Sequence, residues 1–274
     1  MKTFKRIKKL QEAVLFASSK ERLVVADIAT DHGYLAESLS KQERVSKIIA
    51  TDISKKCLSK VEKLVEKCHL EKIETRLGDG LEPIEKVDVS VIAGVGGFEI
   101  IKMLERQNKA SNGVKCELFV LQPAQNVLEL RHWVFDKKFK VIKDYVIADA
   151  DRFYPILIVD VSREEINEKT IKNLWIGRDA ESEKEDFKLF LLDQLEYLKF
   201  LEDLPEERID CDPVLKDKRE LKNIIENTLK MWYTLVVRSY YDWKDFRISK
   251  SRIRLVGFAN RTFWLSWQKK GCWD

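Results

Sequence analysis

Cysteine pairs, long hydrophobic runs and a dinucleotide-binding glycine fingerprint are all missing from this chain of 274 residues. Its 5 cysteines form no C-x-x-C pair, which argues against a disulfide framework and against a zinc site. No apolar run approaches the ~20 residues of a membrane-spanning helix, and the basic N-terminus lacks the apolar stretch of a secretion signal. We therefore expect a soluble, cytoplasmic protein with no membrane partner and no bound metal.

The segment from Leu23 to Leu35 predicts where a ligand binds. A β-branched apolar run ends at Asp27, and small residues and Gly33 lead into a new apolar period, which indicates a buried strand followed by a helix. In open parallel sheets, ligands bind beyond the carboxyl ends of the strands. Because Ala29 and Asp31 stand where a G-x-G-x-x-G motif has glycines, the loop favours S-adenosylmethionine over a dinucleotide. A turn without a ligand is the alternative that this segment leaves open.

Two further acids follow predicted strands. Asp52 comes 25 residues after Asp27, the interval at which a βαβ unit places an acid on a ribose diol, although residues 51–54 would also serve as a helix cap. Asp79 lies between two glycines, where its carboxylate would accept the exocyclic amine of an adenine. A simple Asp-Gly turn is the alternative there. Together these acids predict a nucleoside-binding edge of the sheet.

Two later loops predict the place of the reaction. Three glycines within residues 94–97 follow a predicted fourth strand and leave the backbone open to close approach by a substrate. A phosphate-binding loop is disfavoured because the Gly-Lys-Ser/Thr ending is missing. A fifth strand ends in Gln122 and Pro123. Gln122 has a donor and an acceptor, which suits reading the edge of a base, although a buried glutamine that satisfies loop backbone would look the same.

The remaining segments predict helices, a hairpin and a tail. A first helix with Thr3 as its N-cap carries residues 5, 6, 8 and 9, all basic, largely away from its apolar face. This basic rim could steer RNA or could be a solvated helix face. Strands over 140–148 and 153–161 form an antiparallel hairpin. Apolar periods over 187–201 and 221–236 predict two antiparallel helices, for which a structural prop or a homodimer contact is one interpretation.

Charge is unevenly distributed over the C-terminal part. Residues 164–237 carry 12 Lys/Arg against 19 Asp/Glu, which argues against a broad electrostatic grip on nucleic acid. Residues 238–274 carry 9 Lys/Arg against 3 Asp/Glu, interleaved with aromatic side chains. Such a tail could stack on unpaired RNA, or form a small β element without a part in catalysis.

Four motifs in this order resemble one family: residues 26–35 (ADIATDHGYL), 78–81 (GDGL), 92–97 (IAGVGG) and 121–123 (LQP). Over roughly residues 1–230 the chain resembles the bacterial tRNA (adenine-22 N1)-methyltransferases, which use S-adenosylmethionine. The resemblance implies an α/β fold with a Rossmann-like, seven-stranded methyltransferase sheet over 1–163. It also implies a C-terminal helical hairpin, or coiled coil, over 164–237 that helps to hold tRNA. Residues 238–274 remain a tail of unassigned structure.

The resemblance, together with the chemistry of methyl transfer, suggests roles for single residues. We expect S-adenosylmethionine to contact Asp27, Ala29, Gly33, Asp52, Ile53, Asp79, Gly80, Ala93 and Gly94. We expect the target base to contact Tyr34, Gly96, Gly97, Pro123 and Asn126. The expected reaction moves a methyl group to N1 of adenine 22, in the D-loop region of tRNA, with Asp31, His32 and Gln122 as catalytic residues. Asp31 would stabilise the cationic product base, and His32 would orient that carboxylate or the base.

Two positions depart from the family pattern. Ala124 follows Leu-Gln-Pro where many members have Asn, and Pro155 stands between Tyr154 and Ile156 where members tend to have Glu. A proline at that place fits only an edge strand or a bulge. These differences keep two alternatives open: a methyltransferase with another RNA or small-molecule acceptor, and an inactive cofactor-binding or RNA-binding relative. A nicotinamide-dependent oxidoreductase is a distant third, because the dinucleotide fingerprint is missing.

The role assigned to Asp31 makes a kinetic prediction. If its carboxylate stabilises charge on the acceptor base, Asp31→Ala lowers kcat much more than it weakens cofactor binding. Steady-state kinetics and calorimetric titration of S-adenosylmethionine measure the two effects separately. Equal losses in kcat and in affinity would instead make Asp31 a cofactor ligand.

Overall fold

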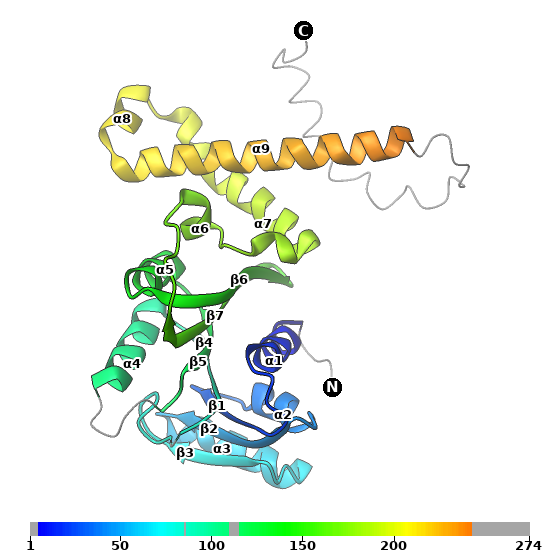
Figure 1. The fold of residues 1–274 in the computed structure, drawn as a ribbon, viewed down its shortest axis with the longest axis vertical. Helices are drawn as coiled ribbons and strands as arrows, with labels where there is room; N and C mark the ends of the chain where they lie inside the picture. Colours follow the sequence, from blue (N-terminus) through cyan, green and yellow to red (C-terminus); the bar gives the residue numbers. More distant parts are fainter. Residues whose placement is uncertain (1–4, 85, 110–114, 243–274) are drawn as a thin grey trace. The chain divides into compact units, whose positions relative to one another are not determined.

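The structure, a computed structural model, describes residues 5–84, 86–109 and 115–242. The chain divides into two compact units, residues 1–226 and 227–274. The first unit holds a sheet and most of the helices (Figure 1). In the second unit the described residues, 227–242, form the last part of one long helix.

The sheet contains seven strands in the order β3-β2-β1-β4-β5-β7-β6. Their bounds are β1 (Leu23–Ile28), β2 (Val45–Asp52), β3 (Ile73–Leu77), β4 (Val89–Val95), β5 (Leu118–Pro123), β6 (Phe139–Asp149) and β7 (Arg152–Glu164). The first five strands pair in parallel, and β7 pairs antiparallel with both β5 and β6. The predicted Rossmann-like methyltransferase sheet is therefore confirmed, with its antiparallel hairpin at one end.

Helices cover both faces of this sheet (Figure 1). On one face α1 (Lys5–Ala17), α2 (Tyr34–Ser40) and α3 (Lys55–Cys68) bury their apolar stripes. On the other face α4 (Gly97–Lys109) and α5 (Val127–Asp136) do the same. Strand β1 lies between β2 and β4, and five of its six residues are buried, which explains why its sequence is apolar without alternation. The carboxyl ends of the parallel strands consequently meet at one edge, where Asp27 and Asp52 lie.

The place of Pro155 differs from the expectation for a proline on the last strand. It lies on β7, which is an interior strand, because β6 forms the edge of the sheet. Pairing of β7 with β5 stops at Leu157, so Pro155 pairs only with Val146 of β6. Locally, Pro155 therefore has the free side that a proline requires, without an edge strand or a bulge.

The C-terminal helices are more broken than the apolar periods predicted. They comprise α6 (Ile171–Trp175), the 3-10 helix η1 (Ala180–Ser182), α7 (Lys184–Tyr197), the 3-10 helix η2 (Leu198–Asp203), α8 (Glu206–Cys211) and α9 (Pro213–Asp242). Proline 205 precedes α8 and Pro213 begins α9, as proline's fixed φ favours at a helix start. Helices follow the sheet as expected, but not as a simple hairpin. The expected tail begins inside α9, and residues 243–274 lie outside the described part, as does Thr3.

A buried ion pair joins three of these elements. Arg131 of α5 and Asp144 of β6 expose only 1% and 0% of their side chains. The guanidinium donates from Nε and Nη2 to the two carboxylate oxygens, at 2.9 Å each. Its remaining three hydrogens go to the backbone carbonyls of Leu174, Trp175 and Ile176, at 3.1 Å. All five donors of the guanidinium are thus satisfied, and the α6 segment is fixed against the sheet.

Removing one partner of this pair should destabilise the fold. We predict that Arg131→Met lowers the free energy of unfolding by about 3–5 kcal/mol, because Asp144 is left buried without a counter-charge. The double variant Arg131→Met/Asp144→Leu should recover a large part of that loss. Urea unfolding at neutral pH measures both. A single variant within about 1 kcal/mol of the parent chain would contradict the prediction.

Candidate active site

The loop between β1 and α2 has an unusual backbone. Ala29, Asp31 and Gly33 all have left-handed φ values, of 56°, 48° and 71°. Non-glycine residues rarely adopt this region, and strain of this kind persists only where the surroundings hold it. Here backbone bonds do so: Thr30 donates to the carbonyl of Thr51 at 2.9 Å. The loop is therefore held against the end of β2 in one shape.

Asp27 is buried at the end of β1 and holds the other side of this loop. The hydroxyl of Thr30 donates to its Oδ2 at 2.7 Å, and the backbone N–H of Ala36 donates a second hydrogen bond. Burial raises the pKa of Asp27 to about 6, against the opposing effects of these two hydrogen bonds and of Arg6. The charge at this position consequently changes with pH close to neutrality.

Asp31 and His32 lie on the exposed side of the loop, toward α3. His32 Nδ1 is 2.6 Å from Asp31 Oδ2, and the Lys60 ammonium is 3.2 Å from His32 Nε2. Because lysine only donates, His32 Nε2 accepts and Nδ1–H donates to Asp31. Although burial opposes it, hydrogen bonds from His32 and Cys57 hold the pKa of Asp31 below its usual value. Tyr34 stacks on His32, with ring centroids 5.5 Å apart.

The ends of β2 and β3 offer groups that fit a nucleoside. Asp52 Oδ2 accepts from the backbone of Asp31 at 3.2 Å, and its Oδ1 accepts from Ser54 at 2.9 Å. Each carboxylate oxygen keeps a further lone pair for a ribose hydroxyl. Next to it Ile53 is 72% exposed, an apolar side chain that suits contact with the flat face of a base. These residues fit the nucleoside half of S-adenosylmethionine.

Asp79, the third predicted acid, already has a partner. Arg106 of α4 donates to both of its carboxylate oxygens, at 2.5 and 3.3 Å, and holds the pKa of Asp79 below its usual value. An adenine amine at this place would share the carboxylate with the guanidinium. Gly80 follows with a left-handed φ of 57°, which glycine adopts without strain.

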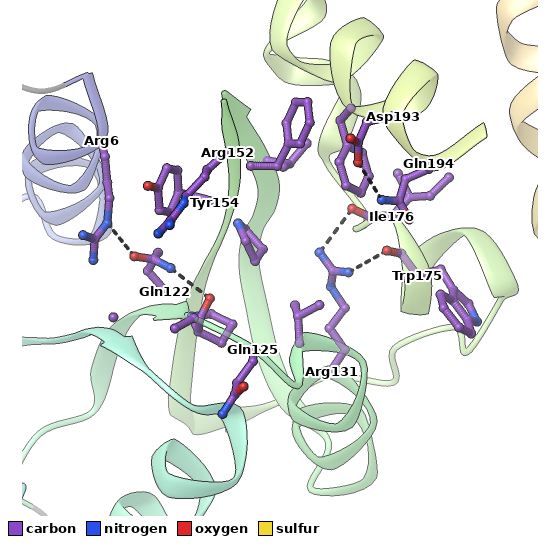
Figure 2. A pocket seen from close by; sticks show the side chains of 18 of the residues that line it. Arg6, Gln122, Gln125, Arg131, Arg152, Tyr154, Trp175, Ile176, Asp193 and Gln194 are labelled. Carbon is purple, nitrogen blue, oxygen red and sulfur yellow. Dashed lines mark hydrogen bonds between the residues drawn. The ribbon is translucent and has the colours of Figure 1, made fainter. Parts of the chain in front are cut away.

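A cleft of about 700 Å³ opens at the carboxyl ends of β4 and β5 (Figure 2). This volume lies within the range of about 300–1,000 Å³ that is usual for ligand pockets. Its walls come from the ends of β4 and β5, the loop after β5, the β6–β7 hairpin, and helices α1, α5, α6 and α7. Four aromatic rings and three guanidinium groups line it: Phe153, Tyr154, Trp175, Phe190, Arg6, Arg131 and Arg152. The carboxylates of Asp151 and Asp193 line it as well.

Gln122 lies in the wall of this cleft but is only 1% exposed. Its Oε1 accepts from Arg6 Nε at 2.7 Å, and its Nε2 donates to the carbonyl of Pro123 at 2.9 Å, as Figure 2 shows. Both ends of the amide are therefore bonded to protein groups. Recognition of a base by Gln122 stays a prediction. Only the second hydrogen of Nε2 is still available to donate to a base.

The glycine-rich loop packs tightly on the loop after β5. A Cβ on Gly97 would lie 2.2 Å from the backbone oxygen of Asn126, so no side chain fits there. The Gly97 N–H donates to the carbonyl of Gln125 at 2.9 Å. Asn126 itself has a left-handed φ of 58° at the start of α5. The structure thus gives Gly97 and Asn126 a packing role, beside the substrate contact predicted for them.

The predicted residues fall into two groups. The first lies around the β1–α2 loop and β2, and contains Asp27, Ala29, Asp31, His32, Gly33, Tyr34, Asp52 and Ile53. The second lies at the cleft or packs beside it, and contains Ala93, Gly94, Gly96, Gly97, Gln122, Pro123 and Asn126. Asp31, His32 and Tyr34 are not among the residues that line the cleft. Asp79 and Gly80 follow β3.

The cleft also contains residues that sequence patterns did not single out. Arg6 was expected on the outer face of the first helix, but its side chain reaches inward to Gln122. Phe190 stacks edge-to-face on Phe153, with centroids 5.5 Å apart, and thereby joins α7 to the hairpin. Apolar periodicity had marked helix 187–201 without Phe190, and no local signal connects it to Phe153.

Among the described residues, no cluster of His, Cys, Asp and Glu is arranged to hold a metal ion. None of the described helices has the length and hydropathy that a membrane span requires.

The strand order and the acids at the strand ends define a Rossmann-like methyltransferase domain. Residues 5–157 match the family described as a methyltransferase domain. The chain belongs to this methyltransferase family and is similar to bacterial tRNA methyltransferases.

Relatives of known name support this placement. The chain is 31% identical over 140 residues to the tRNA (adenine(22)-N(1))-methyltransferase of Bacillus subtilis, a match over 50% of this chain and 58% of that enzyme. It is 31% identical over 153 residues to a proposed tRNA methyltransferase of Mycoplasma pneumoniae, over 55% of this chain and 70% of that protein. The match thus spans less than two thirds of the Bacillus enzyme.

A solved structure covers more of the chain. A proposed tRNA (m1A22) methyltransferase of Streptococcus pneumoniae, in complex with S-adenosyl-L-methionine, is 29% identical with a TM-score of 0.65. The likeness covers 80% of this chain and 98% of that one, and so includes helices beyond the sheet.

The raised pKa of Asp27 predicts a pH dependence of stability. In the folded chain this carboxyl titrates near pH 6, above its ordinary value of 3.8, so folding favours its protonated form. The stability that follows from this preference is complete below pH 4 and is lost as pH rises through 6. Relative to Asp27→Asn, the parent chain should lose about 3 kcal/mol across that window. Urea unfolding without cofactor at pH 4 to 7 measures this difference. Parallel pH profiles for the two chains would contradict it.

Proposed function

We propose that this chain moves a methyl group from S-adenosylmethionine to N1 of adenine 22 in tRNA, acting in the cytoplasm. The observation that carries the proposal is the aromatic and cationic cleft at the ends of β4 and β5, beside an edge that fits the cofactor's nucleoside. A flipped base needs apolar faces, and the phosphates around it need cations. The names of the relatives then select the tRNA adenine among possible acceptors.

The chemistry at N1 depends on geometry more than on proton transfer. Held at Asp52 and Ile53, S-adenosylmethionine would supply an electrophilic methyl group to the N1 lone pair. The carbon–sulfur bond would break with its electron pair on sulfur, and the positive charge would pass to the base. No proton has to leave N1, so no general base is required. The contribution of the protein is to align N1 with the methyl group and to exclude water, which can account for much of the rate enhancement.

The walls of the cleft suit a base that has left its stack. The N1 edge of adenine is hidden in a paired helix, so the nucleotide has to be unstacked before it can react. Tyr154, Trp175 and Phe190 offer flat faces for the base, and Arg152 offers a cation for a neighbouring phosphate. Ala124, where relatives tend to have Asn, also lines the cleft and cannot donate or accept through its side chain.

Two of the three lysines of α1, Lys5 and Lys9, are not free to attract RNA. Lys5 pairs with Asp186 at 2.5 Å, and Lys9 pairs with Glu183 at 3.0 Å, both on the first turn of α7 or just before it. These bonds tie α1 to the helical part instead. We therefore assign the binding of tRNA to the cleft rather than to the basic rim of α1, and no dimer is needed to complete this site.

Two transcripts test the proposal directly. Labelled methyl should pass from S-adenosylmethionine to a tRNA with adenine at position 22, and not to the same tRNA with guanine there. Nuclease digestion and chromatography should identify the product as N1-methyladenosine. The guanine transcript should not be methylated because guanine carries a proton on N1, where adenine has a lone pair.

The outcomes also separate the alternatives. Label in both transcripts would indicate another acceptor position. Cofactor binding by calorimetry, with no label in either transcript or in bulk RNA, would indicate a binding protein without this activity.

A further inference from the structure

Arg6 connects the cofactor side of the site to the cleft. Its guanidinium interacts electrostatically with Asp27, and a Cβ on Gly94 would lie 3.1 Å from its Nη2. Its Nε donates to Gln122, and its guanidinium lies over the ring of Tyr154, 5.2 Å from the centroid. Figure 2 shows Arg6, Gln122 and Tyr154 together at one end of the cleft. The absence of a side chain at Gly94 leaves the space that the guanidinium occupies.

We propose that Arg6 is a positioning residue, which fixes the carboxamide of Gln122 and the ring of Tyr154 as the wall against which the acceptor base lies. The link to methyl transfer rests on the proposed function. The positioning itself rests on the hydrogen bonds of the chain alone.

The orientation of the Gln122 amide follows from the chemistry of its neighbours. Arginine has only donors, so Gln122 Oε1 has to face Arg6 Nε. A backbone carbonyl only accepts, so Gln122 Nε2 has to face the oxygen of Pro123. Rotating the amide by half a turn would place donor against donor and oxygen against oxygen. Without Arg6, one of the two restraints on this orientation is lost.

Arg6 is itself held from several sides, which a positioning residue requires. Its backbone N–H donates to Asp149 Oδ2 on the β6–β7 hairpin, at 2.8 Å. The ion pairs of Lys5 and Lys9 with the start of α7 fix the helix on either side of it. Arg6 therefore joins three walls of the cleft: the end of β5, the hairpin and, through α1, the helical part.

A double-mutant cycle tests whether Arg6 acts through Gln122. Arg6→Met keeps the length of the side chain and removes the donor, and Gln122→Met removes its acceptor. We expect each to lower kcat by about ten- to a hundredfold, with KM for S-adenosylmethionine and for tRNA changed less than about threefold. The double variant should lose no more than the worse single variant, because both remove one unit.

Lys8→Met is the matched control. Lys8 is an exposed residue of the same helix, so this variant removes the same charge and should retain kcat within about twofold. Thermal unfolding of each variant, in the intact chain, identifies any loss that comes from misfolding. Equal losses in Arg6→Met and Lys8→Met would overturn the proposal in favour of a general charge effect. Losses that multiply in the double variant would show that Arg6 acts independently of Gln122, and would overturn it too.

A second readout does not depend on activity. The measurement is an NMR spectrum of the side-chain amides in the ¹⁵N-labelled chain. The resonance that the parent chain shows and Gln122→Met lacks is assigned to Gln122. It should shift or broaden in Arg6→Met and stay in place in Lys8→Met. An unchanged resonance in Arg6→Met would overturn the positioning role. If the parent chain methylates no RNA, the proposed function fails, and this resonance alone decides the role of Arg6.

Discussion

The buried ion pair of Arg131 and Asp144 is the constraint on which the geometry of the cleft depends. Two charges without water are stable only when every donor and acceptor is bonded, and here the guanidinium uses all five hydrogens. Three of those hydrogens hold the backbone of α6, where Trp175 and Ile176 line the cleft. Because a partly bonded guanidinium would cost several kcal/mol, intermediate positions of α6 are disfavoured. The cleft therefore has one well-defined far wall.

The site divides its electrostatics between two neighbouring regions. Carboxylates at the ends of β1 and β2 favour a ligand with an amine and a sulfonium, both of which are cationic. Arg6 and Arg152 line the cleft together with Asp151 and Asp193, and under the proposed function its arginines face the phosphates of a nucleic acid. Arg6 lies between the two regions and interacts electrostatically with Asp27. The positive charge of the cleft and the negative charge at the strand ends therefore partly neutralise each other. This arrangement suits the proposed function, in which a cationic cofactor and an anionic substrate bind side by side.

Sequence patterns predicted the cofactor edge better than the cleft, and the physical reason is locality. Asp27, Asp52 and Asp79 each end a strand that its own residues specify, and parallel strands bring those ends together. The cleft is assembled from residues between Arg6 and Gln194, on eight helices and strands and the loops between them. Which of them meet depends on tertiary packing such as the contact of Phe190 with Phe153. Hydrophobic periodicity treats every arginine as a surface residue, so it placed Arg6 outside.

The position of the acceptor base connects these observations to the reaction. Stabilisation of the product by Asp31 requires the base to approach the exposed side of the β1–α2 loop, where His32, Cys57 and Lys60 already bind that carboxylate. Alignment by the Gln122 wall requires the base to lie in the cleft, where aromatic faces are available. Methylation of N1 needs no proton acceptor, so a side chain of fixed orientation contributes more than one that titrates. Gln122 is buried and bonded at both ends, whereas Asp31 is exposed and already neutralised, and this contrast favours the cleft as the place where the base is held.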